Sequence, residues 1–92
     1  MISNLDFESA VVLARSRIDQ LGQTVGDQFE ILPDQTKEIE QGWVFFFNTA
    51  DFVRTRNAMF ALAGNGPILV TREGGIYELP SAIPWEDAAR KI

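Results

Sequence analysis

The amino-acid sequence predicts an α+β fold, with an N-terminal amphipathic helix packed on a small antiparallel sheet and a short C-terminal helix. Three observations predict it: an apolar stripe at helical spacing near the N-terminus, the aromatic segment GWVFFFN at residues 42–48, and two apolar runs joined by Gly74 and Gly75. Apolar runs joined by hairpin-length turns favour antiparallel pairing, and we expect the helices on one face of the sheet. The length of 92 residues suits one domain, so residues 1–92 are expected to form a single one.

The first helix is predicted to run from Phe7 to Leu21. Its apolar residues recur at helical spacing and are Phe7, Ala10, Val11, Ala14, Ile18 and Leu21. Asp6 is a residue type that caps helix N-termini, because its carboxylate accepts hydrogen bonds from free backbone N–H groups. Gly22 is predicted to end the helix, since glycine adopts the left-handed conformation at low cost.

Short strands and turns are predicted for the middle of the chain. Residues 29–32 form a strand candidate that Pro33 and Asp34 stop, and the polar residues 35–41 have extended character near residues 37–39. The aromatic strand then runs from about Glu40 to Asn48. Residues 50–63 are predicted to be irregular, with a short helix or a further strand.

The last part of the chain is predicted to form a hairpin and a helix. Residues 68–72 and 76–79 are apolar runs on either side of a turn in which Gly74 and Gly75 supply the backbone freedom that a tight turn needs. Pro84 fits the first position of a helix, so residues 85–92 are predicted to be helical.

The aromatic strand is apolar on both faces. Alternation places Trp43, Phe45 and Phe47 on one side and Val44 and Phe46 on the other. One face should pack on the first helix. The other face is either covered, as in a central buried strand, or exposed as an apolar patch for a partner.

The net charge of −5 is unevenly distributed. Residues 1–50 carry eight acidic and three basic side chains, whereas residues 51–92 carry five of each. An acidic half argues against nucleic acid, which requires clustered Lys and Arg. It either serves solubility alone or attracts a basic protein partner and accelerates its association.

The residues that most enzymes use are missing from the sequence. It contains no histidine and no cysteine, which removes the common general base, the thiol nucleophile and the usual zinc ligands. Glu38 and Glu40 would share a face of an extended segment, but a solvated acidic edge is favoured over an acid–base pair. Residues 64–67 lack the Lys-Ser/Thr ending of a phosphate-binding loop and are interpreted as a turn. We therefore expect a non-enzymatic protein without cofactor or metal.

Neither export nor membrane insertion is predicted. No apolar stretch approaches the roughly 20 residues that cross a bilayer, and the first residues lack the basic and apolar regions of a secretory signal. We expect a cytoplasmic protein that does not contact membranes.

Several segments together resemble the immunity protein 35 family, which includes YrhB-type bacterial proteins. They are the first helix with Ala10 and Ala14, residues 42–48, the run GNGPILV at residues 64–70, Gly75 with the strand after it, and the helix start at Pro84. The resemblance covers nearly the whole chain. It implies a small α+β domain that is encoded beside a polymorphic or contact-delivered toxin, binds that toxin and protects the producing cell. It implies no catalytic residues.

The predicted partner is therefore a cognate protein toxin, whose active site or substrate surface the protein would occlude. We predict Asp34, Glu38 and Glu40 as charged rim residues and Phe46 as an aromatic anchor of the interface. Specificity is expected in residues 23–41 and 49–63, because connecting segments vary without disturbing a core. The alternative is a small chaperone-like domain that binds unfolded proteins through an open apolar sheet face. A homodimer is also consistent with the sequence.

Overall fold

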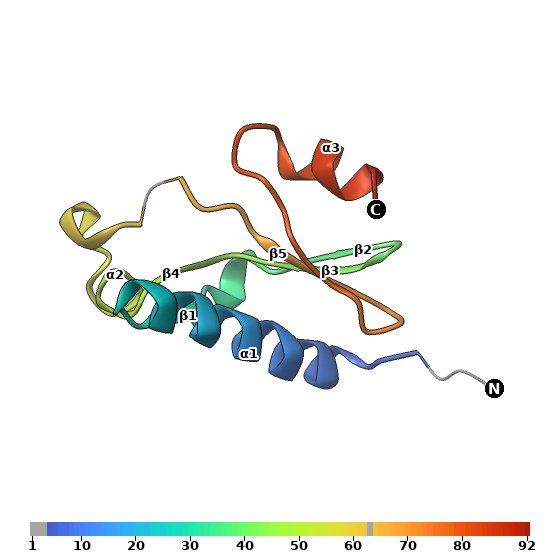
Figure 1. The fold of residues 1–92 in the computed structure, drawn as a ribbon, viewed down its shortest axis with the longest axis horizontal. Helices are drawn as coiled ribbons and strands as arrows, with labels where there is room; N and C mark the ends of the chain where they lie inside the picture. The colour runs from blue at the N-terminus through green and yellow to red at the C-terminus, as the bar shows by residue number, and fades with distance from the viewer. Residues whose placement is uncertain (1–3, 63) are drawn as a thin grey trace.

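The computed structural model describes residues 4–62 and 64–92. Its long helix lies on one side of a sheet and its C-terminal helix on the other (Figure 1). In chain order the elements are α1 (Phe7–Val25), β1 (Phe29–Ile31), the 3-10 turn η1 (Pro33–Gln35), β2 (Lys37–Ile39), β3 (Gly42–Phe45), β4 (Phe47–Thr49), α2 (Ala50–Thr55), the 3-10 turn η2 (Ala58–Phe60), β5 (Ile68–Thr71), β6 (Ile76–Glu78) and α3 (Trp85–Arg90). The predicted α+β class is confirmed.

The larger sheet has the strand order β2–β3–β5–β6, and β1 pairs separately with β4. Each pairing between the described strands is antiparallel. The predicted aromatic strand forms β3 and β4, which are interrupted only at Phe46. There the Phe46 carbonyl accepts a hydrogen bond of 2.8 Å from the backbone N–H of Leu32, so the chain between β1 and β2 stays attached to the aromatic strand across the interruption.

Helix α1 begins as predicted and ends later than predicted. The Asp6 carboxylate accepts a hydrogen bond of 2.8 Å from the backbone N–H of Ser9. This bond stabilises the charged form and lowers the pKa of Asp6. At the other end, the prediction that Gly22 ends the helix is wrong, because Gly26, with φ 73°, is the left-handed cap.

Gly22 serves close packing instead of termination. A Cβ atom on Gly22 would lie 2.6 Å from the carbonyl oxygen of Asp27, closer than real Cβ atoms approach. The absence of a side chain therefore lets the chain turn back tightly from α1 toward β1.

Two hydrophobic clusters lie on opposite faces of the sheet. On the α1 face, small and branched residues of the helix pack against Trp43 and Phe45. On the α3 face, Val44 and Leu69 pack against Ala88 and Ala89 of that helix. The expectation that the helices share one face is wrong, because strands that are apolar on both faces require cover on both.

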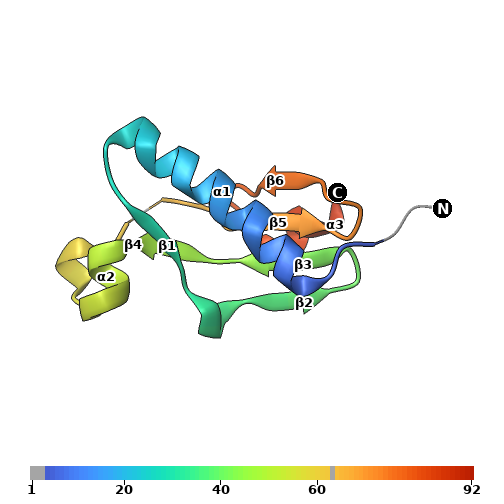
Figure 2. The same cartoon turned by 90° about the horizontal axis from the view of Figure 1, so that it is seen from below.

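The segment after β4 lies at one end of the molecule (Figure 2). Thr49 fixes it, because its hydroxyl accepts a hydrogen bond of 3.0 Å from the backbone N–H of Phe52 and donates one of 2.8 Å to the carbonyl of Phe60. A short helix, α2, is therefore the correct one of the two predicted alternatives. The last residue of that predicted segment, Ala63, lies outside the described residues.

The predicted hairpin and terminal helix are confirmed. β5 pairs with β6 across a turn in which Gly74 has φ 98°. The backbone N–H of Gly75 donates a hydrogen bond of 2.9 Å to the Thr71 hydroxyl. Pro84 precedes α3 as its N-cap, one position before the predicted one.

Candidate partner-binding surface

Asp34 lies in η1, where it is exposed to solvent. One of its carboxylate oxygens is 3.9 Å from the guanidinium of Arg56, just after α2. An exposed pair at this distance contributes little to stability, so the Asp34 charge remains accessible to a partner.

Glu38 and Glu40 lie in different environments. Glu38 is on β2 and forms an ion pair of 3.1 Å with Arg72. Glu40 lies in the turn after β2 and not on the strand, so the two carboxylates do not share a strand face as expected. The backbone carbonyl of Glu40 instead accepts a hydrogen bond of 3.0 Å from the Arg72 side chain.

Phe46 contacts the C-terminal helix. It is half-buried, and its ring meets the ring of Trp85 edge-on, with 6.1 Å between the centroids. Phe46 packs on the α3 cluster, whereas Glu38 is the cross-strand partner of Trp43, which belongs to the α1 cluster. The structure therefore places Glu38 and Phe46 on opposite faces and does not bring the four predicted residues together.

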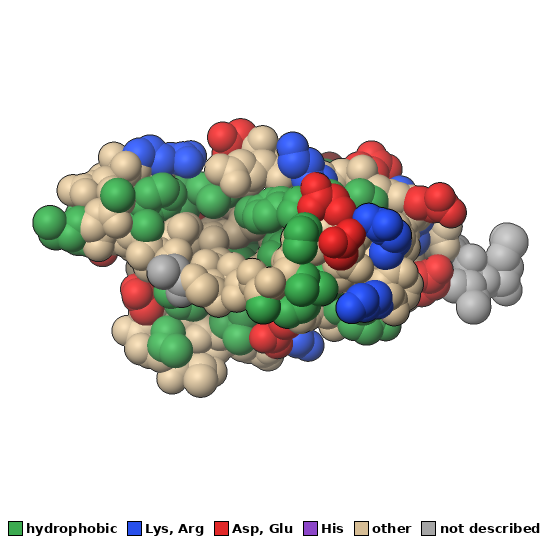
Figure 3. All heavy atoms as spheres, turned by 90° about the horizontal axis from the view of Figure 1, so that it is seen from above, with side chains coloured by type: hydrophobic (Ala, Val, Ile, Leu, Met, Phe, Trp, Pro, Cys, Tyr) green, Lys and Arg blue, Asp and Glu red, His purple; other side chains and the backbone are tan. Residues whose placement is uncertain are grey.

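The surface on the α3 side has no dominant charge. Figure 3 shows acidic and basic side chains next to one another over the half of that face that carries α3. Within α3, Arg90 and Asp87 form an ion pair of 2.7 Å. This face therefore offers no strong electrostatic preference for a partner.

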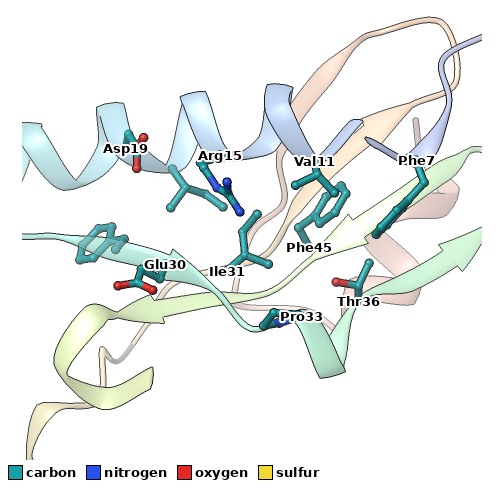
Figure 4. A pocket seen from close by; sticks show the side chains of 11 residues that line it. Phe7, Val11, Arg15, Asp19, Glu30, Ile31, Pro33, Thr36 and Phe45 are labelled. Atoms are coloured by element: carbon teal, nitrogen blue, oxygen red, sulfur yellow. The ribbon is translucent and has the colours of Figure 1, made fainter. Parts of the chain in front are cut away.

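A groove lies between α1 and the chain from β1 to β2 (Figure 4). Its volume is about 530 Å³, within the roughly 300–1,000 Å³ that is common for ligand sites. The apolar part of its lining consists of Phe7, Val11, Ile18, Phe29, Ile31, Pro33 and Phe45. Phe7 is 46% exposed, so an aromatic side chain is available at one end of the groove.

Charged side chains lie along the edge of this groove. Arg15 and Asp19 come from α1, and Glu30 comes from β1 (Figure 4). A second hollow of about 400 Å³ is lined by Asp19 and Glu30 and also by Asp27. The two hollows share Asp19 and Glu30, so the groove continues into an acidic margin.

Sequence reasoning did not find this groove. The helical stripe predicts that Val11 faces the sheet, and residues 29–32 are predicted only as a short strand. However, a groove depends on the spacing between α1 and β1, which a local sequence pattern does not define. One sequence feature could have indicated the groove: the charged residues Arg15 and Asp19 lie beside the apolar stripe of the helix.

The described residues contain little that indicates catalysis or metal binding. In residues 4–62 and 64–92, no group of three or more acidic side chains is placed to hold a metal ion. The pKa of Asp6 is lowered by the hydrogen bond with which this carboxylate caps α1. None of the described helices has the length and apolar character that crossing a membrane requires.

Comparison with known proteins identifies the family. The family model described as Immunity protein 35 matches residues 8–91. The chain belongs to the immunity protein 35 family. It is also similar to the Uncharacterized protein YrhB of Escherichia coli (strain K12), with 38% identity over 48 residues, 51% of each chain. The matched region thus spans about half of this relative. No solved structure matches the chain significantly.

Proposed function

We propose that this member of the immunity protein 35 family binds a cognate toxin protein in a bacterial cell and neutralises it by covering its active site or substrate surface. The family match over residues 8–91 carries this proposal. The proposed location is the cytoplasm and the proposed unit is a single domain. A homodimer is compatible with this role.

Binding is favoured over catalysis by the side chains of this protein. The sequence contains no histidine and no cysteine, the residues that most often act as general base or thiol nucleophile. A shifted pKa often marks a catalytic group, but the lowered pKa of Asp6 has its cause in helix capping. These features support a protein that acts by its shape and charge.

Occlusion of a toxin requires a whole face of this small protein. A stable interface buries roughly 600–1,000 Å² on each partner, and the accessible surface of the protein is 5910 Å². The proposed centre of this interface is the groove beside α1, because its apolar lining can receive an anchoring side chain. The exposed charge of Asp34, which follows the groove residue Pro33, suits its rim, as the sequence suggested. Glu38 and Glu40, on and beside β2, are the other proposed rim charges.

The chaperone-like alternative is less well supported. It requires an open apolar sheet face, but Trp43 and Phe45 are buried beneath α1 and Val44 and Leu69 beside α3. Suppression of the aggregation of many unrelated unfolded proteins at stoichiometric amounts would favour this alternative.

Co-expression with the toxin encoded beside the gene tests the proposed function. We expect cells that produce the toxin to grow when the protein is present, and the two proteins to purify together. A toxin variant inactivated at its catalytic site provides the control, because it should still bind while it causes no growth defect. Continued growth arrest without co-purification would refute the proposal.

A further inference from the structure

We infer that the groove between α1 and β1 is the toxin-binding site, and that it accepts an apolar side chain of the toxin that is followed by Lys or Arg residues. This inference rests on the proposed function and adds the chemistry of the recognised segment. The groove has an apolar floor and an acidic margin beside it, and these two features define that chemistry.

The floor of the groove is suited to an apolar side chain. Phe45 at its base is fully buried, while Val11 and Ile31 on its two sides are only partly covered. Phe7 at one end leaves 46% of its surface exposed. A side chain of the partner placed here would remove this apolar surface from water, as aromatic and aliphatic anchors do at interface hot spots.

The margin of the groove carries excess negative charge. Asp19 and Glu30 line both hollows, and Asp27 lines the second. The ion pairs between described residues include none of these three carboxylates. Arg15 is the one cation among the described residues that line the two hollows, so these charged residues together carry a net charge of −2.

The helix adds to this negative potential. The C-terminal end of an α-helix carries a partial negative charge, and the last turn of α1 contains no basic residue to offset it. Asp27 follows directly after the cap Gly26. Cationic side chains of a partner would therefore be attracted to this end of the groove, whereas phosphate groups would be repelled.

A second copy of the chain suits this margin less well. Four of its eight Lys and Arg side chains already form closer ion pairs with carboxylates of the same chain, namely Arg17, Arg54, Arg72 and Arg90. A toxin segment with free Lys or Arg residues has no such internal competition. Charge complementarity thus favours the toxin as the occupant.

Two pairs of matched variants test this site with the catalytically inactivated toxin as the probe. The first pair compares the double variant Asp19→Lys/Glu30→Lys with Glu73→Lys/Glu86→Lys, which makes the same change of charge at exposed carboxylates that line neither hollow. We expect the groove variant to reduce the association rate about tenfold or more at low salt. The remote variant should change it much less.

The second pair compares Val11→Arg with Val12→Arg. Val11 lines the groove, whereas the adjacent Val12 does not and is exposed. We expect Val11→Arg to raise the dissociation constant about a hundredfold, because a charged side chain in the groove would keep out the apolar anchor of the toxin. Val12→Arg should leave it nearly unchanged. Thermal unfolding of each variant verifies that it is folded, and the exposed charge variants keep the test decisive if Val11→Arg unfolds.

The outcomes separate this inference from the proposed function. If the wild-type protein binds the toxin and both members of each pair bind equally well, the groove is not the site although the protein is an immunity protein. If the wild-type protein does not bind the toxin, both proposals fail. A selective loss in the groove variants, with salt-dependent association in the wild type, supports the inference.

Discussion

The guanidinium group of Arg72 lies over the ring of Trp43, 4.8 Å from its centroid. The same group donates hydrogen bonds of 3.1 Å to the Glu38 carboxylate and 2.8 Å to the carbonyl of Ile39. Arg72 follows β5, Trp43 is on β3, and Glu38 is on β2. One side chain therefore connects the ends of three adjacent strands, and Glu38 has a structural partner in addition to its proposed role in binding.

Replacement of Arg72 by methionine should destabilise the fold by about 1–3 kcal/mol, because it removes the cation–π contact and charged hydrogen bonds to backbone carbonyls. Chemical denaturation measures this loss. Glu38→Gln provides the control, since an exposed ion pair contributes less than about 1 kcal/mol. Equal losses in the two variants would show that the ion pair, and not the contacts with Trp43 and the backbone, carries the stabilisation.

Trp43→Ala should lower the free energy of unfolding by about 3–5 kcal/mol, because the Trp43 ring is buried in the α1 cluster. This is a large part of the stability of a small domain. Tyr77→Ala is the matched aromatic control, as Tyr77 is 41% exposed and should cost much less. A thermal unfolding midpoint unchanged by Trp43→Ala would contradict this core.

Two glycines should respond differently to alanine. A Cβ atom at Gly66 would overlap the carbonyl oxygen of Leu79, while one at Gly26 would meet no atom within 4 Å. We expect Gly66→Ala to cost about 3 kcal/mol or more through overpacking. Gly26→Ala should cost about 1 kcal/mol, because only its left-handed backbone is strained. Denaturant titration of both variants gives the comparison, and a larger loss at Gly26 would be inconsistent with this packing.

Acid should remove the contribution of the Asp6 cap. The hydrogen bond from Ser9 lowers the pKa of Asp6 in the folded protein, so the carboxylate stabilises the fold above its unfolded pKa of about 4. That stabilisation is lost as the pH falls through the lower, folded pKa. Asp6→Ala should therefore reduce the melting temperature at neutral pH, and the difference from the wild type should shrink in acid. A difference that is independent of pH would be evidence against the cap.

Local patterns in the sequence predict much of this fold. The alternation of Trp43, Val44 and Phe45 assigns each side chain to the correct face, and Asp6 marks the correct start of α1. The sequence predicts the wrong end for α1, because Gly22 and Gly26 are both residues that can cap a helix C-terminus. The contact between Gly22 and the chain after the helix decides between them, and that contact is not visible in a local pattern.

Non-local packing also explains what was missed at the candidate site. Asp34 and Glu38 are exposed, as expected of rim charges, but their partners Arg56 and Arg72 come from distant parts of the chain. The cover that α3 provides depends on its small side chains, which give no strong apolar signal in the sequence. The groove, in turn, arises from the spacing between two elements and not from any motif.

Titration of the purified toxin with the purified protein tests the central claim most directly. If the protein acts by occlusion, the activity of the toxin should fall in proportion to the amount of protein added and reach a minimum at a fixed molar ratio. Under conditions in which the Trp43→Ala variant is unfolded, it should not inhibit the toxin. Full toxin activity in the presence of an excess of the folded wild-type protein would contradict the account.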